Sequence, residues 1–134
     1  MTRLYLLDTN IASYVIKGSV PAVRRHIERV PMAQLSISAV TEGELLYGVA
    51  RRPEATRLQA IVNEFLLRVS VQPWDSSAAR HYGELRAALE RQGRPIGNLD
   101  MMIGAHALAL RAVLVTNDQA FSRIRGLKIE NWAS

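Results

Sequence analysis

The chain contains no cysteine, which excludes disulfides, thiolate zinc sites and cysteine nucleophiles. It also lacks long apolar runs, since none approaches the roughly 18 residues that a membrane-spanning helix needs. The apolar stretch 4–7 is too short for the hydrophobic core of a signal peptide. Neither of the glycine patterns typical of phosphate-binding loops, GxGxxG and GxxxxGKS/T, occurs. We therefore expect a cytoplasmic protein without a nucleotide-binding loop.

The composition is that of a folded protein. The chain has 134 residues, 49% of them hydrophobic, and a mean hydropathy of zero, which predicts one globular domain over residues 1–134. The net charge is +5, and arginine outnumbers lysine by 15 to 2. The arginine fork suits phosphate recognition, but a genome that favours arginine codons produces the same bias. The charge is therefore only a mild indication of a nucleic-acid partner.

Short apolar segments alternate with segments of helical periodicity. The apolar segments predict strands at residues 3–7, 34–37, 69–72, 112–115 and 128–130. The periodic segments predict helices at residues 10–17, 21–30, 39–51, 54–68, 76–92 and 99–111. This alternation is typical of βαβ units. We predict an α/β fold with a central parallel sheet of about four to five strands, flanked by helices on both faces.

Four acidic residues stand at comparable points of this pattern. Asp8 directly follows the first predicted strand, and Asp118 comes three residues after the strand at 112–115. Glu44 and Asp100 lie in the first turns of predicted helices. In a right-handed parallel α/β fold, strand carboxyl ends and helix amino ends share the edge of the sheet where ligands bind. We therefore expect these four carboxylates to meet there.

Each of these acids also has a purely structural interpretation. Asp8 and Asp118 are suited to capping turns or helices. Thr41 and Glu44 have the spacing of a capping box, and Asp100 complements a helix dipole. A cap contributes only about 1 kcal/mol, whereas each close pair of carboxylates repels by ~1 to ~4 kcal/mol. A hard divalent cation such as Mg²⁺ or Mn²⁺ would offset this repulsion, which makes a cation site the better interpretation.

A cation held by carboxylates suggests hydrolysis of a phosphodiester. The ion would orient a water, lower its pKa and neutralise charge on the phosphate. In-line attack by water would then leave a 5′-phosphate and a 3′-hydroxyl. Two of the acids are flanked by four polar residues: Thr9, Asn10, Thr116 and Asn117. We predict that these residues orient a carboxylate or a water. The alternative is that they only form ordinary turns.

The remaining candidates for catalysis are weaker. The three histidines are scattered and are expected to pack in the core or lie at the surface: His26, His81 and His106. Trp74 and Trp132 are expected to be core or rim residues rather than platforms that stack bases.

The four acids occur within longer segments of recognisable sequence. These segments are LLDTN at 6–10, SAVTEGEL at 38–45, IGNLDMMI at 96–103 and LVTND at 114–118. In order and spacing they resemble the acidic motifs of PIN-domain ribonucleases, most closely the VapC group, which comprises toxins of bacterial type II toxin–antitoxin operons. The tail at 125–132 also resembles the end of such chains. The similarity spans essentially the whole length.

The resemblance implies an endoribonuclease that uses Mg²⁺ or Mn²⁺. It also implies a homodimer or a larger toxin–antitoxin assembly, and a cognate antitoxin that covers the active site. Carried over by motif, the metal-binding and catalytic acids are Asp8, Glu44, Asp100 and Asp118. Glu42 lies two residues before Glu44 and would face roughly 160° to 200° away around the helix. Ala120 replaces an acid that relatives often have before Phe121.

Two other function classes remain open. One is a different metal-dependent phosphoryl-transfer enzyme with Asp8 as nucleophile, although Asn10 stands where a second carboxylate would be expected. The other is a non-catalytic RNA- or protein-binding module whose acids only cap helices. Five arginines are candidates for contacting RNA, and the sequence does not rank them: Arg24, Arg51, Arg52, Arg86 and Arg94.

Overall fold

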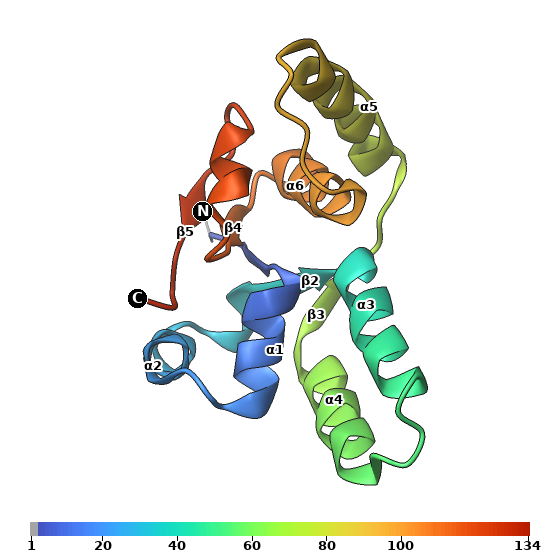
Figure 1. Cartoon of the computed structure of the whole chain (residues 1–134). Helices are drawn as coiled ribbons and strands as arrows, with labels where there is room; N and C mark the ends of the chain where they lie inside the picture. Colours follow the sequence, from blue (N-terminus) through green and yellow to red (C-terminus); the bar gives the residue numbers. More distant parts are fainter. Residues whose placement is uncertain (1–2) are drawn as a thin grey trace.

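Five short strands form one parallel sheet in the computed structural model, which describes residues 3–134 (Figure 1). The strands are β1 (Tyr5–Leu7), β2 (Leu35–Ser38), β3 (Ser70–Gln72), β4 (Val113–Val115) and β5 (Ile129–Glu130). Their order in the sheet is β3-β2-β1-β4-β5. In the central strand β1, Leu7 is level with Ile37 of β2 and with Val115 of β4. The predicted parallel sheet is confirmed.

Six α-helices connect or follow these strands. They are α1 (Thr9–Lys17), α2 (Pro21–Arg29), α3 (Ala39–Ala50), α4 (Thr56–Arg68), α5 (Ser76–Arg91) and α6 (Asn98–Leu110). Every bound lies within two residues of the predicted one, because caps such as Asp75 before α5 and the left-handed Gly18 after α1 are local signals. Two short 3₁₀ helices, η1 (Met32–Gln34) and η2 (Gln119–Arg123), were not predicted. None of the helices described in residues 3–134 is long and apolar enough to cross a membrane.

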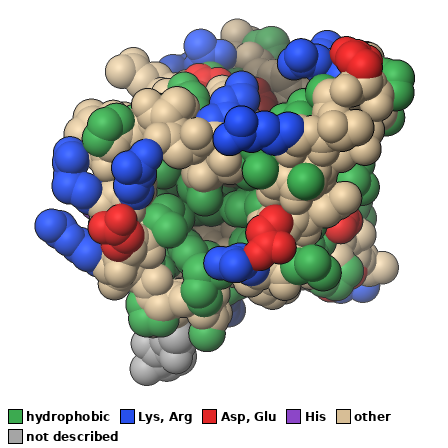
Figure 2. All heavy atoms as spheres, turned by 90° about the horizontal axis from the view of Figure 1, so that it is seen from below, with side chains coloured by type: hydrophobic (Ala, Val, Ile, Leu, Met, Phe, Trp, Pro, Cys, Tyr) green, Lys and Arg blue, Asp and Glu red, His purple; other side chains and the backbone are tan. Residues whose placement is uncertain are grey.

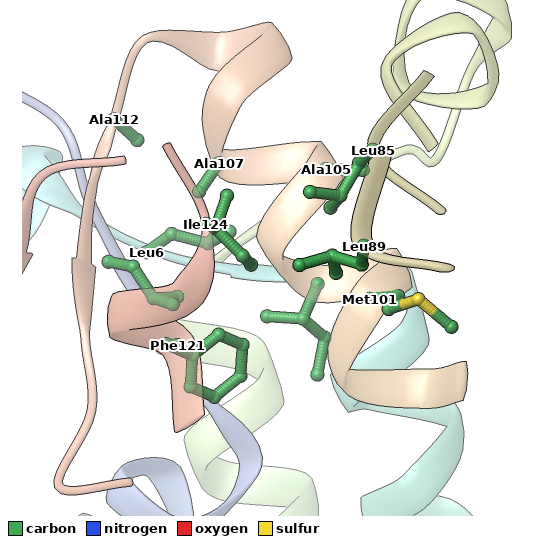
Figure 3. Close-up of a cluster of buried hydrophobic side chains, with 11 residues drawn as sticks. Leu6, Leu85, Leu89, Met101, Ala105, Ala107, Ala112, Phe121 and Ile124 are labelled. Atoms are coloured by element: carbon green, nitrogen blue, oxygen red, sulfur yellow. The ribbon is translucent and has the colours of Figure 1, made fainter. Parts of the chain in front are cut away.

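The sheet separates two hydrophobic cores, because successive side chains of a strand point to opposite faces. Leu6 of β1 belongs to one core with side chains of α5, α6 and η2, including Leu89, Ala105 and Phe121 (Figure 3). Leu7 belongs to the other core, with residues of α1, α2 and the C-terminal segment such as Ile11, Val23 and Trp132. Helices therefore cover both faces of the sheet, as predicted.

Helix α6 lies unusually close to η2. A Cβ atom built on Gly104 of α6 would come 2.5 Å from Cδ1 of Ile124, the residue that follows η2. Ile124 is itself buried in the same core (Figure 3). Asp100 is on α6, and Asp118 is the N-cap of η2. This contact between the two helices therefore helps to fix the positions of both acids.

Candidate active site

The candidate site lies where the strand order changes direction. From β1 the chain continues to β2 and β3 on one side of the sheet, whereas β4 and β5 lie on the other side. Asp8 immediately follows β1, and its amide donates to the carbonyl of Val115 at the end of β4 (3.0 Å). Open α/β sheets bind ligands outside the carboxyl ends of their strands at such a switch point.

Asp8 is buried and also caps a helix. Its side chain is only 4% exposed, and Oδ1 accepts a hydrogen bond from the amide of Ile11 in α1 (2.8 Å). Burial raises the pKa of the Asp8 carboxyl, and the charges of Asp100 and Asp118 raise it further. Hydrogen bonding to the Thr116 side chain and to the Ile11 amide lowers this pKa, but the net shift is upward. The capping interpretation of Asp8 is confirmed, yet it leaves a carboxyl whose ionised form is disfavoured.

Asp100 is the acid that connects the others. It is the third residue of α6, whose N-cap is Gly97. Burial raises the pKa of the Asp100 carboxyl, and the negative charges of Asp118 and Glu44 raise it as well. Since Asp100 in turn raises the pKa of Asp8, the structure brings the four predicted acids into one electrostatic cluster, hereafter the carboxylate cluster.

Glu44 turns toward the start of α1 instead of closing a capping box. The N-cap of α3 is Ser38, whose hydroxyl accepts from the Val40 amide (3.1 Å). Thr41 therefore lies inside the helix, which contradicts the alternative interpretation of Thr41 and Glu44 as a capping box. Glu44 Oε1 accepts a hydrogen bond from the Thr9 hydroxyl (2.6 Å), which also lies 3.2 Å from the hydroxyl of Thr41. The buried Thr41 was not predicted as a site residue, although its position one helical turn before Glu44 offered a signal.

Asp118 is the exposed member of the carboxylate cluster. Its Oδ1 accepts from the Ala120 amide (2.9 Å) at the start of η2, so its capping role is confirmed. Its own amide donates to the hydroxyl of Thr116 (3.0 Å). Thr116 thus interacts with both Asp8 and Asp118, as the flanking position predicts.

The two flanking asparagines differ from the two threonines. Asn117 is exposed and donates to the hydroxyl of Tyr14 (3.3 Å). Asn10 is also exposed and lines a pocket next to Glu44. Thr9 and Thr116 are therefore the flanking residues with hydrogen bonds toward the acids.

The three histidines lie outside the carboxylate cluster. His106 is buried in α6, with Nδ1 2.8 Å from the Ser38 hydroxyl, and burial lowers its pKa. His81 contacts the Ser77 carbonyl, and His26 stacks on Trp132 with ring centroids 5.2 Å apart. The expected packing and surface roles are confirmed, as is the core position of Trp132, which is 1% exposed.

The arrangement of the acids matters for metal binding. No set of three or more His, Cys, Asp or Glu side chains among residues 3–134 is arranged as it would be around a metal ion. Mg²⁺, however, commonly binds one or two protein carboxylates and keeps several waters. The carboxylate cluster supplies oxygen donors only, and its members repel one another. This donor set fits a hard, hydrated divalent cation.

Basic side chains of residues 3–134 form no continuous patch on the face that Figure 2 shows. There Lys and Arg side chains lie at several separate places around a hollow that contains hydrophobic side chains. Of the five candidate arginines, Arg51 and Arg52 line a pocket that includes Thr9 and Glu44. Arg24 donates instead to the Gly18 carbonyl (2.7 Å), and Arg86 to the Tyr82 hydroxyl (2.9 Å).

The fold and the site place the chain in a class of parallel α/β domains that carry acidic residues at the switch point of the sheet. Comparison with known proteins identifies the family. The family model of the PIN domain matches residues 5–127. The tRNA(fMet)-specific endonuclease VapC of Shigella flexneri is 38% identical, over 96% of this chain and 98% of its own length. Ribonuclease VapC2 of Rickettsia felis is 37% identical, over 96% of this chain and 98% of its own length.

A solved structure agrees with these relatives. A chain in the crystal structure of DNA-bound VapBC from Salmonella typhimurium superposes with a TM-score of 0.90 at 37% identity, covering 97% of this chain and 98% of that one. The chain therefore belongs to the PIN-domain family, within its group of VapC ribonucleases.

Proposed function

We propose that this chain is a metal-dependent endoribonuclease and the toxin of a bacterial toxin–antitoxin pair. Its catalytic and metal-binding residues are Asp8, Glu44, Asp100 and Asp118. The observation that supports this most strongly is the carboxylate cluster itself. Helix capping accounts for Asp8 and Asp118, but it does not account for Asp100 lying near enough to Asp8 to raise its pKa, or for Glu44 lying near enough to Asp100 to do the same.

One or two of these carboxylates at a time would hold Mg²⁺ or Mn²⁺, together with several waters. When bound, the ion would supply an oriented, acidified water and would neutralise charge on the phosphodiester. The chain's own residues keep these acids in place. Thr9 fixes the Glu44 carboxylate by the 2.6 Å hydrogen bond, and the Ile11 amide fixes that of Asp8 at 2.8 Å.

Attack by water on the RNA phosphodiester breaks the bond from phosphorus to the 3′-oxygen. The products are a 5′-phosphate and a 3′-hydroxyl, and the proton lost by the water balances the one gained by the 3′-oxygen. Exposed Asp118 lies on the open side of the cluster, whereas Asp8 forms its buried side. The substrate would therefore approach from the side of Asp118.

The partners follow from the same family. The Salmonella relative was crystallised as VapBC bound to DNA, and we propose that this chain likewise binds a cognate antitoxin, which covers the active site. A homodimer or a larger toxin–antitoxin assembly, a cytoplasmic location and a single domain over residues 1–134 stay predictions.

The decisive experiment compares the wild-type chain with Asp8→Asn and Asp100→Asn. We expect wild type to cleave total RNA in Mg²⁺ and to be toxic when expressed without antitoxin, and each variant to be at least 100-fold slower. Cleavage should stop in excess chelator and return with Mg²⁺ or Mn²⁺. Equal cleavage by all three proteins would contradict the assigned site, and no cleavage by wild type would favour a non-catalytic module whose acids are caps. Cleavage that survives chelation would exclude the metal.

A further inference from the structure

A pocket of about 260 Å³ opens between α1, α3 and α4, beside the carboxylate cluster. Thr9 and Glu44, which share the 2.6 Å hydrogen bond, belong to its lining. Asp8, Asp100 and Asp118 do not. The pocket therefore joins the candidate active site at Glu44 and extends away from the other acids.

The lining combines apolar and basic side chains. The apolar residues come from all three helices and are half-buried or buried: Ile16, Leu45, Val49, Leu58 and Val62. The cations Lys17, Arg51 and Arg52 also line the pocket and are exposed. The Arg51 guanidinium lies 5.5 Å from the centre of the Tyr47 ring, a cation–π contact that orients it. An anionic ligand with a flat apolar part matches this combination.

The helical register sets the distance between the cations and the acids. Glu44, Gly48 and Arg51 are four and three residues apart, so they lie on one face of α3. At 1.5 Å rise per residue, Arg51 lies about 10 Å along the helix from Glu44. On α1, Lys17 is similarly about two turns from Thr9. The cations thus lie about two helical turns from Glu44 and Thr9, at a spacing that lets them contact a neighbouring part of a strand whose phosphate is held at the acids.

We propose that this pocket binds the nucleotide of the RNA substrate next to the scissile phosphate. Lys17, Arg51 and Arg52 contact its phosphate, and the apolar side chains contact its base. The proposal rests on the ribonuclease function proposed above. A protein segment is the rival occupant. Lys17, Arg51 and Arg52 outnumber Glu44, the acid of the lining. They still give the pocket an excess of positive charge, although Arg52 also lies 4.0 Å from the exposed carboxylate of Glu54. This excess favours a polyanion.

Gly48 allows the pocket to be filled without disturbing the fold. A Cβ atom built on Gly48 meets nothing within 4 Å, and the same holds for Gly83 in α5, which lines none of the pockets described. Gly48→Leu therefore places a side chain in the pocket, and Gly83→Leu is the matched control. Both replace a helical glycine by a strong helix former, so neither should lower stability.

RNA binding is measured with a fluorescein-labelled single-stranded RNA decamer, by anisotropy in chelator, with Asp100→Asn in every protein to prevent cleavage. We expect Gly48→Leu to weaken binding at least tenfold and Gly83→Leu to change it less than twofold. In the catalytically active chain, Gly48→Leu should raise KM at least tenfold. Arg52→Gln should also reduce the slope of log Kd against log salt by about 1, whereas Arg80→Gln on α5 should not.

The possible outcomes test the pocket proposal and the ribonuclease proposal independently. If Gly48→Leu and Gly83→Leu bind RNA equally and have equal KM values while wild type cleaves RNA, the pocket proposal is overturned alone. If wild type cleaves no RNA, the ribonuclease function fails, whereas weaker RNA binding by Gly48→Leu would still support the pocket. If Gly48→Leu leaves RNA binding intact but prevents capture of the antitoxin, the pocket belongs to the protein partner and the proposal is overturned.

Discussion

Asp8 and Asp100 are held in surroundings that disfavour their charge. Burial is the main cause of both raised pKa values, and neighbouring acids add to each shift. The folded chain therefore binds these protons more tightly than the unfolded chain does. In this case the free energy of unfolding falls as pH rises from the ordinary carboxyl value of 3.8 through the raised pKa values, and the loss is complete above them.

Replacing Asp100 by Asn tests this electrostatic account. Its carboxylate interacts unfavourably with three other acids, at roughly 1 kcal/mol for a pair about 4 Å apart in water. Its favourable interaction with the α6 dipole is worth about 0.3–1 kcal/mol at an exposed site and up to ~2 kcal/mol at a half-buried one such as this. We expect Asp100→Asn to raise the free energy of unfolding by about 1–2 kcal/mol at pH 7 in chelator, and to flatten its pH dependence. Urea melts between pH 4 and pH 8 measure both effects. Lower stability of the variant would mean that Asp100 acts mainly as a helix-start residue.

Asp8 both caps α1 and contributes a carboxyl to the carboxylate cluster. Two substitutions separate these roles. Asparagine can still accept the Ile11 amide hydrogen bond, whereas alanine cannot. Asp8→Ala should therefore be about 1 kcal/mol less stable than Asp8→Asn in urea melts, and both should lack ribonuclease activity. Equal stability of the two variants would show that the cap at α1 contributes little.

At the scale of elements, the packing of α6 against η2 positions two of the acids. Gly104→Ala would bring a Cβ atom to 2.5 Å from Ile124 Cδ1, and Ile124 is only 3% exposed. We expect overpacking to cost about 1–3 kcal/mol of unfolding free energy, of which the higher helix propensity of alanine offsets about 0.5–1 kcal/mol, and we expect RNA cleavage to slow. In Gly83→Ala the new Cβ meets nothing within 4 Å, so that variant should gain about 0.5–1 kcal/mol. Equal effects of the two substitutions would contradict close packing at Gly104.

At the scale of the whole molecule, a cation that binds the carboxylate cluster should stabilise the fold. The unfolded chain does not hold the four acids together, so Mn²⁺ should bind only the folded state and raise Tm. At 100 times its Kd, the gain is about 2.7 kcal/mol. Differential scanning calorimetry with and without Mn²⁺ measures the rise, and Asp100→Asn should show a smaller one. An unchanged wild-type Tm at millimolar Mn²⁺ would exclude a metal site in the cluster.

The sequence by itself determined the elements and their order. Periodicity, caps and strand-end acids are local signals, so the bounds of every α-helix and strand, though not the two 3₁₀ helices, were predicted within two residues. The same local reasoning identified which acids would stand at the carboxyl edge, because strand direction in a parallel sheet fixes that edge.

Only the tertiary structure decided what contacts these acids. Glu44 accepts a hydrogen bond from Thr9, 35 residues away, and Ser38 rather than Thr41 is the N-cap of α3. The pocket beside Glu44 likewise depends on three helices meeting, which sequence periodicity does not specify. Local propensity places each side chain on its helix, whereas packing between helices determines its partner.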